Sequence, residues 1–193
     1  MMNKIGVQQS YQMAVDYQKL CLDDAGNSTW QVPEFFAKQA SSNAPWDFSY
    51  VDTSITDGVA TITINRPEAM NALNETVIKQ LGQAVNAVNA NTAVHTMVLD
   101  GAGKAFVAGA DVKFFVDKIR SNSIGDIVEF TSNGHEVLNA IENSSKTTVA
   151  LTTGLALGGG LELALCCDYR IGTRRTQFRF PETSIGIYPG LGG

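Results

Sequence analysis

Two glutamates lie where a carboxylate is unusual. Glu162 interrupts an otherwise apolar run, Leu161–Cys167, in which an unpaired buried charge is costly. We therefore expect it to be either a partner for the start of a helix or an acid/base group. Glu182 follows Pro181 between hydrophobic residues, where a solvated loop glutamate is the ordinary expectation. It becomes a candidate because two carboxylates that meet in one pocket can divide the roles of acid and base.

A run of glycines, Gly158–Gly160, directly precedes Glu162 in the sequence. Successive glycines let a ligand atom approach the backbone closely, and they permit dihedral angles closed to other residues. A helix that begins here directs N–H groups toward the turn, where they could hold a polarised carbonyl oxygen. The alternative interpretation is a tight structural turn.

A second stretch of small residues, Ala108–Ala110, leads into Asp111, which can cap a helix. The ordinary interpretation is a turn from a strand to a helix. The functional interpretation is that the N–H of Ala110 points at the same oxygen as the N–H of Gly159, which would form an oxyanion hole. One donor of such a pair lowers a reaction barrier by about 2.7–4 kcal/mol.

Other classes of site fail on residue spacing. The stretch 101–104 lacks the first glycine of a phosphate-binding P-loop, and the glycine run has Leu163 where a dinucleotide fingerprint needs Gly or Ala. The chain contains no G-x-S-x-G nucleophile elbow. His95 and His135 have no Cys or carboxylate at ligand spacing, so we expect structural or surface histidines and no metal site.

Hydrophobic periodicity predicts the elements that position these residues. Alternating β-formers predict strands at 59–65, 96–99 and 148–153, and shorter β candidates follow at 169–171 and 177–178. Helical spacing of apolar residues predicts helices at 71–89, with Asn71 or Asn74 as N-cap, 124–141 and 161–167. Such alternation indicates parallel βαβ units and an α/β fold. Residues 1–52 instead predict a short helix that ends at Gly26, a second short helix and loops.

The composition is that of an acidic globular chain. Its 193 residues include 14 Lys and Arg against 19 Asp and Glu, a net charge of −5. The sequence lacks the clusters of Lys and Arg through which proteins bind a phosphate backbone, so we expect no nucleic-acid partner. We also expect no membrane partner, because no apolar stretch reaches spanning length. Cys21, Cys166 and Cys167 predict neither a metal site nor a disulfide, which favours a cytoplasmic location.

Five motifs, in order and with fitting gaps, resemble the crotonase (enoyl-CoA hydratase/isomerase) superfamily. The resemblance begins near Ser54 and rests on Asn65–Asn74, Ala105–Asp111, Gly154–Ala164, Cys167–Asp168 and Phe180–Gly193. It implies a spiral of ββα units, so we expect a crotonase-like domain over residues 53–193. Residues 1–52 lie outside it as an N-terminal extension. Because the chain stops on a glycine cluster after the last motif, we expect the helical C-terminal part of the fold to be missing.

Family members bind acyl-CoA thioesters, and the resemblance assigns roles to the candidate residues. The N–H groups of Ala110 and Gly159 would hold the thioester oxygen. Glu162 would position and deprotonate the water that attacks Cβ, and Glu182 would manage the proton delivered to Cα. Further residues match stretches that embrace the substrate and its CoA part: Ala69, Ala72, Ala108, Asp111, Val112, Lys113 and Gly158.

The resemblance therefore predicts an enoyl-CoA hydratase, which adds water across the 2,3 double bond of a 2-enoyl-CoA in β-oxidation-type metabolism. It implies no separate cofactor, since coenzyme A is part of the substrate, and a homotrimer or hexamer. Two alternatives stay open: an enoyl-CoA isomerase that uses Glu182 to shuttle a proton, and a non-catalytic acyl-CoA-binding module. Residues 1–52 could also be the tail of a fused hydroxyacyl-CoA dehydrogenase domain, as in some relatives.

Overall fold

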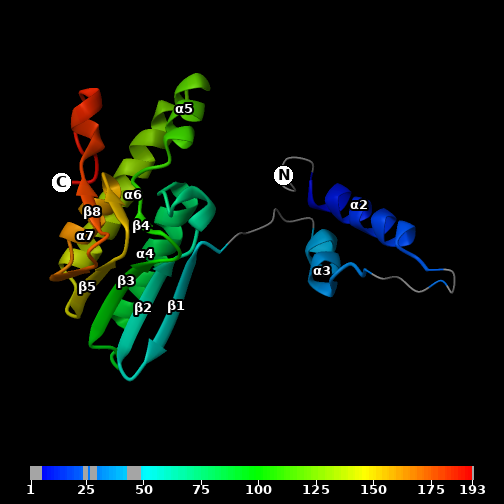
Figure 1. Cartoon of the computed structure of the whole chain (residues 1–193), viewed down its shortest axis with the longest axis horizontal. Helices are drawn as coiled ribbons and strands as arrows, with labels where there is room; N and C mark the ends of the chain where they lie inside the picture. Colours follow the sequence, from blue (N-terminus) through cyan, green and yellow to red (C-terminus); the bar gives the residue numbers. More distant parts are fainter. Residues whose placement is uncertain (1–5, 24–25, 27–29, 43–48, 193) are drawn as a thin grey trace. The chain divides into compact units, whose positions relative to one another are not determined.

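The computed structural model describes residues 6–23, 26, 30–42 and 49–192, and the chain divides into two units (Figure 1). The first unit is Met1–Phe48 and the second is Ser49–Gly193. The predicted boundary between residues 52 and 53 falls inside β1 (Val51–Thr56). Val51 and Asp52 belong to the second unit because they already pair with Ile64 and Thr63 of the neighbouring strand.

The first unit contains two helices, α2 (Val7–Leu20) and α3 (Glu34–Ser42). Val7, Phe36 and Ala40 form a small buried cluster, and the rings of Tyr11 and Phe36 meet edge to face with centroids 5.6 Å apart. The predicted helix end at Gly26 is wrong, since α2 ends at Leu20. Leu20 is largely exposed, so no apolar burial at this end favours a longer helix.

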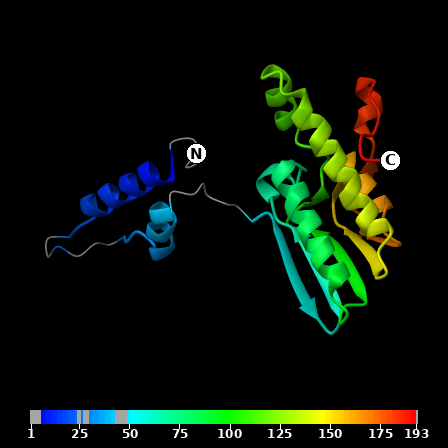
Figure 2. The ribbon, with the colours of Figure 1, turned by 180° about the vertical axis from the view of Figure 1, so that it is seen from behind.

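The second unit is built on a five-stranded sheet with the order β1-β2-β3-β5-β7. β1 is antiparallel to β2, and all other pairs are parallel. The remaining strands of this sheet are β2 (Val59–Ile64), β3 (Thr96–Gly101), β5 (Thr147–Thr152) and β7 (Tyr169–Gly172). Two helices, α4 (Glu75–Ala90) and α6 (Ile124–Glu142), cover one face of the sheet (Figure 2). Alternating residues of β2 and β3 are buried, as their period-two patterns predict.

A second, smaller sheet has three parallel strands in the order β4-β6-β8. These strands are β4 (Ala105–Val107), β6 (Leu155–Leu157) and β8 (Gln177–Arg179). Each strand leads into a helical segment, which is α5 (Val112–Arg120), α7 (Gly159–Leu165) and the 3-10 helix η2 (Pro181–Ile185) respectively. A further 3-10 helix, η1 (Pro67–Ala69), follows β2. None of the described helices is both long and apolar enough to cross a bilayer.

The N-caps of two helices follow from the sequence. Asn74 caps α4, because its side chain accepts a hydrogen bond of 2.9 Å from the N–H of Val77. Asp111 caps α5 as predicted, since it accepts 3.1 Å from the N–H of Lys113. Asn71, the other N-cap candidate, is instead fully buried and donates to the carbonyl oxygens of Ala105 (2.8 Å) and Phe106 (3.1 Å).

Asp168 joins the end of α7 to β5. Its Oδ2 accepts hydrogen bonds from the N–H (2.8 Å) and the hydroxyl (3.0 Å) of Thr148, and these donors lower the pKa of the Asp168 carboxyl below its ordinary 3.8. A carboxyl whose pKa is lower in the folded state stabilises the fold above its unfolded pKa. This stabilisation is lost as the pH falls through the folded pKa.

We therefore expect Asp168→Asn to flatten the acid side of the stability profile. Between about pH 5 and about pH 2, the wild type should lose more unfolding free energy than the variant. Urea unfolding followed by circular dichroism at several pH values measures this difference. Asp57→Asn, an exposed change in the β1–β2 turn, serves as the matched control and should keep the wild-type slope. Equal slopes for Asp168→Asn and the wild type would contradict the prediction.

Candidate active site

Three neighbouring parallel strands bring the candidate residues to one edge of the smaller sheet. Ala110 follows β4, Gly158 and Gly159 follow β6, and Glu182 follows β8 (Figure 1). Parallel strands that lie side by side end at the same edge, so residues far apart in the sequence become neighbours there. In open α/β sheets this carboxyl edge is where ligands commonly bind.

Glu182 lies directly against the glycine turn. A Cβ placed on Gly158 would lie 2.2 Å from Oε1 of Glu182, and Gly158 has a φ of +47°, so only glycine fits this position. The Oε2 atom of Glu182 is buried and accepts no hydrogen bond from the described residues. Glu182 is therefore not the solvated loop glutamate that its sequence context would ordinarily indicate.

Glu162 approaches the same turn from α7. The residue is 3% exposed, and its Oε1 accepts a 2.7 Å hydrogen bond from the N–H of Leu191. Its other oxygen, Oε2, lies 3.8 Å from where a Cβ on Gly159 would be. The structure thus places one glutamate against Gly158 and the other against Gly159, at consecutive residues of a single turn.

The segment that carries Ala110 packs beside this turn. Gly109, with a φ of +85°, lies against the carbonyl oxygen of Leu157, which would be 3.3 Å from a Cβ on Gly109. On the other side, the C=O of Gly109 accepts from the N–H of Leu73, and the N–H of Asp111 donates to the C=O of Leu73, each at 2.8 Å. Because backbone groups alternate along an extended chain, the N–H of Ala110 points away from Leu73.

The two candidate amides have no acceptor within the described part of the chain. This holds for the N–H of Ala110, which turns away from its bridge partner Leu73. The N–H of Gly159 likewise has no acceptor among the described residues, because Gly159 is the first residue of α7 and the first N–H groups of a helix have no intrahelical partner. Both groups can therefore donate to a ligand.

Comparison with known proteins agrees with this architecture. A family model described as enoyl-CoA hydratase/isomerase matches residues 59–193. The chain belongs to the enoyl-CoA hydratase/isomerase family. It is 44% identical over 136 residues to a crotonyl-CoA hydratase of Syntrophomonas wolfei, a match that covers 70% of this chain and 51% of the relative. A short-chain-enoyl-CoA hydratase of Clostridium acetobutylicum is 38% identical over 136 residues, with the same two coverages.

A solved structure of an enoyl-CoA hydratase from Bacillus halodurans is also similar. The TM-score is 0.71 at 32% sequence identity, over 74% of this chain and 57% of that one. The predicted crotonase-like α/β fold is thereby confirmed. The chain spans about half the length of the curated relatives it matches.

Four of the remaining residues that the resemblance singled out lie on the loop after β2 or on the segment that follows β4. The N–H of Ala108 donates to the carbonyl of Met70 (3.1 Å), and the carbonyl of Ala72 accepts from the Arg66 guanidinium (3.0 Å). Ala69 ends η1 and is half-buried. Asp111 forms an ion pair with Arg66. Their role in binding CoA stays a prediction.

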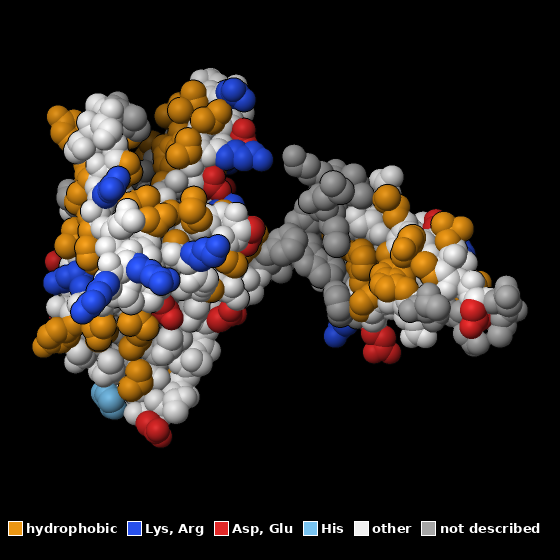
Figure 3. Space-filling view, in the orientation of Figure 1, with side chains coloured by type: hydrophobic (Ala, Val, Ile, Leu, Met, Phe, Trp, Pro, Cys, Tyr) orange, Lys and Arg blue, Asp and Glu red, His pale blue; other side chains and the backbone are white. Residues whose placement is uncertain are grey.

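Val112 and Lys113 are exposed at the start of α5. Further along this helix, Val116 and Ile119 are exposed as well, and apolar side chains gather over α5 in the space-filling view (Figure 3). Val112, Val116 and Ile119 lie at helical spacing, so they form one apolar stripe beside the segment that carries Ala110.

A cavity of about 500 Å³ lies where α6, α7 and the end of the described chain meet. Glu162 lines it together with Leu138, Cys166 and Leu191. A second cavity of about 530 Å³, between α4 and α6, contains none of the predicted site residues. Among the residues that the structure describes, no group of three or more His, Cys, Asp or Glu could hold a metal ion.

The sequence did not predict which residues support the site. Arg66 and Asn71 are polar side chains in a loop, and both bond to residues far along the chain. Leu191 holds Glu162 through its backbone N–H, a contact that the identity of its side chain does not indicate. Arg66 and Asn71 lie within the Asn65–Asn74 motif, which was the available sign that this loop does more than connect two elements.

Proposed function

We propose that this chain carries the catalytic groups of an enoyl-CoA hydratase, which adds water reversibly across the 2,3 double bond of a 2-enoyl-CoA thioester. One observation carries the proposal: the carboxylates of Glu162 and Glu182 lie against consecutive residues of one glycine turn. Relatives named as hydratases, at 44% and 38% identity, support it. The oligomeric state, a trimer or hexamer, and the place in fatty-acid oxidation belong to the same proposal.

The thioester oxygen accepts hydrogen bonds from the N–H groups of Ala110 and Gly159. When water adds to the double bond, negative charge moves through Cα onto this oxygen. Two donors fixed in advance stabilise the resulting enolate more than they stabilise the neutral thioester, and this difference lowers the barrier. The absence of acceptors for both N–H groups within the described residues supports this assignment.

The two glutamates divide the proton transfers. Glu162 removes a proton from the water as its oxygen bonds to Cβ, and Glu182 gives a proton to Cα. The proton held by Glu162 then returns to Glu182 through solvent, so that one water molecule is added in total and both carboxyl groups regain their starting states. The hydrogen bond from the N–H of Leu191 to Oε1 of Glu162 holds this carboxylate in one orientation, with Oε2 toward Gly159. Ala69, Ala72, Ala108, Asp111, Val112, Lys113 and Gly158 contact the substrate and its CoA part.

The proposal is tested by incubating the 193-residue chain with crotonyl-CoA. We expect the absorbance of the conjugated thioester to fall and mass spectrometry to find a product heavier by one water. A parallel incubation contains 3-enoyl-CoA. Conversion of 3-enoyl-CoA to 2-enoyl-CoA without hydration would support the isomerase and overturn the proposal. Binding of crotonyl-CoA without turnover would overturn it in favour of a non-catalytic acyl-CoA-binding module.

A further inference from the structure

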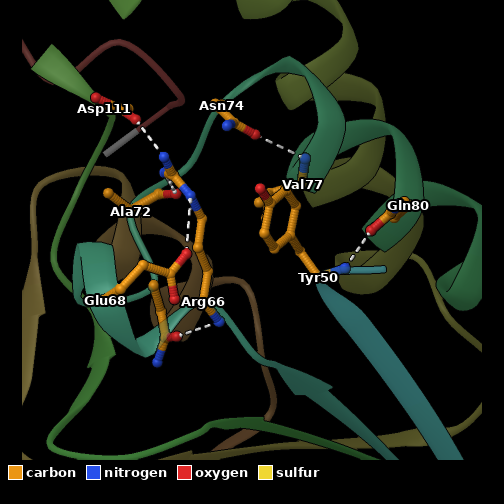
Figure 4. Close-up of polar contacts among 9 residues, drawn as sticks. Tyr50, Arg66, Glu68, Ala72, Asn74, Val77, Gln80 and Asp111 are labelled. Carbon is orange, nitrogen blue, oxygen red and sulfur yellow. Dashed lines mark hydrogen bonds and ion pairs between the residues drawn. The ribbon is translucent and has the colours of Figure 1, made fainter. Parts of the chain in front are cut away.

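The guanidinium of Arg66 lies at the centre of a polar network that includes Asp111, the residue after Ala110 (Figure 4). The side chain of Arg66 is 15% exposed and that of its ion-pair partner, Asp111, is 19% exposed. Nη2 of Arg66 lies 2.8 Å from Oδ2 of Asp111, and Nη1 donates to the carbonyl of Ala72 at 3.0 Å. The Tyr50 ring lies against the guanidinium, with its centroid 5.6 Å from Cζ of Arg66.

This network fastens two chain segments together. Three backbone hydrogen bonds of 2.8 to 3.1 Å, at Ala108, Gly109 and Asp111, join residues 108–111 to residues 70–73. Arg66 adds a side-chain link on each side, since it binds Ala72 in one segment and Asp111 in the other. Its backbone N–H also donates 2.9 Å to Oδ1 of Asn71, the side chain that binds the carbonyls of β4.

Asp111 transmits this constraint to its chain neighbour, Ala110. Its Oδ1 caps α5 by accepting from the N–H of Lys113, and its Oδ2 accepts from Arg66. Each of the two carboxylate oxygens therefore has a partner, and together the partners fix the orientation of the side chain. The peptide that precedes Asp111 is therefore held between the start of α5 and the Arg66 loop.

The N–H of Ala110 belongs to the neighbouring peptide, whose C=O, that of Gly109, accepts a hydrogen bond from the N–H of Leu73. This Leu73 N–H shares a peptide with the C=O of Ala72, which accepts from Arg66. The orientation of the Ala110 N–H therefore depends on Arg66 through two hydrogen-bonded peptides as well as through Asp111.

We propose that Arg66 is a positioning residue that holds the Ala110 N–H in the direction in which it donates to the thioester oxygen. The inference rests on the proposed function, since it assigns Arg66 to the same site. It requires arginine in particular, because the planar fork binds a carbonyl and a carboxylate at once, whereas the lysine ammonium is a point charge on a flexible chain.

The test compares Arg66→Lys, Asp111→Asn and the double variant with the wild type. A thioester labelled with ¹³C at its carbonyl reports the polarisation of the bound substrate by infrared spectroscopy, and steady-state kinetics with crotonyl-CoA separate kcat from KM. In the wild type we expect the carbonyl stretch to move to lower frequency on binding. In Arg66→Lys we expect this frequency shift to be smaller and kcat to fall about tenfold or more. The loss in kcat should be smaller than the roughly 10²-fold to 10³-fold loss caused by removing an oxyanion donor altogether, because the Ala110 N–H is misdirected but still present.

Further controls separate positioning from folding. Arg120→Lys is the matched control, because Arg120 is exposed in the last turn of α5, and it should match the wild type. Asp111→Asn keeps an oxygen for the cap on α5 while it removes the charge that binds Arg66. The double variant should lose no more than the worse single variant, within about threefold, because both changes break one link.

Two results would overturn the inference and leave the proposed function intact. One is a wild-type carbonyl shift and a wild-type kcat in a folded Arg66→Lys protein. The other is a lower kcat with an unchanged carbonyl shift, which would make Arg66 merely structural. A wild-type chain that binds crotonyl-CoA with no carbonyl shift and no hydration would instead overturn the proposed function, and this inference with it.

Discussion

Glu162→Gln and Glu182→Gln are each expected to reduce kcat for crotonyl-CoA hydration by about 10²-fold to 10⁴-fold, the usual contribution of a general acid or base. Glutamine has nearly the shape of glutamate but cannot exchange a proton at neutral pH. In Glu162→Gln, the amide oxygen can still accept from the N–H of Leu191, so the side chain should keep its place. Steady-state kinetics measure the loss. Calorimetric titration with the saturated ester butyryl-CoA should show little change in affinity.

Glu142→Gln provides the matched control for these two changes. Glu142 is exposed on the last turn of α6 and lines the same cavity as Glu162, so the control removes a nearby negative charge without touching the glycine turn. Its kcat should stay within about threefold of the wild type, as for an exposed charge change. Near-normal hydration in Glu162→Gln or in Glu182→Gln would remove that residue from the mechanism.

Gly158→Ala is the second change for which we expect a large effect. An alanine at φ +47° and ψ −122° is strained, and its Cβ would lie 2.2 Å from Oε1 of Glu182. We expect the carboxylate of Glu182 to swing out of the site, because it is the flexible partner in this contact. Hydration should then fall to about the level of Glu182→Gln. The free energy of unfolding, measured with urea, should fall by about 1–3 kcal/mol from the backbone strain, and further from the displaced side chain.

A double-mutant cycle separates the backbone strain from the displacement of Glu182. In a Glu182→Ala background the crowding at Gly158 is absent, so Gly158→Ala should cost less unfolding free energy than it does in the wild type. The backbone strain remains in both backgrounds. Equal costs in the two backgrounds would mean that Glu182 does not lie against Gly158.

Local patterns predicted the elements whose burial repeats regularly. The period-two burial of β2 and the capped, apolar-striped α4 followed from their own residues, since each packs one face on the core. The three-residue strands β4 and β6 were not among the predicted strands, because they are too short to show a period. β1 was missed because five of its six residues are exposed, which leaves no alternation.

In the candidate site, too, the residues with a local sequence signal were predicted more fully than those that depend on contacts between distant segments. Glu162 was visible because a charge interrupts an apolar run, and the structure buries it. The position of Glu182 depends on the pairing of β6 with β8, a contact between segments that the sequence does not connect. Arg66 and Asn71 have partners 31 to 45 residues away, so hydrophobic periodicity and turn signals could not predict these contacts, and only the Asn65–Asn74 motif marked the loop that carries them.

The most direct test of the account is a crystal structure of the chain with the non-reactive ester butyryl-CoA bound. We expect the thioester oxygen to lie about 2.7–3.2 Å from both the Ala110 and the Gly159 backbone nitrogens, the range of an N–H···O hydrogen bond. The carboxylates of Glu162 and Glu182 should then flank the carbons next to the thioester. A thioester oxygen that contacts neither nitrogen, or an acyl-CoA bound in the cavity between α4 and α6, would contradict the account.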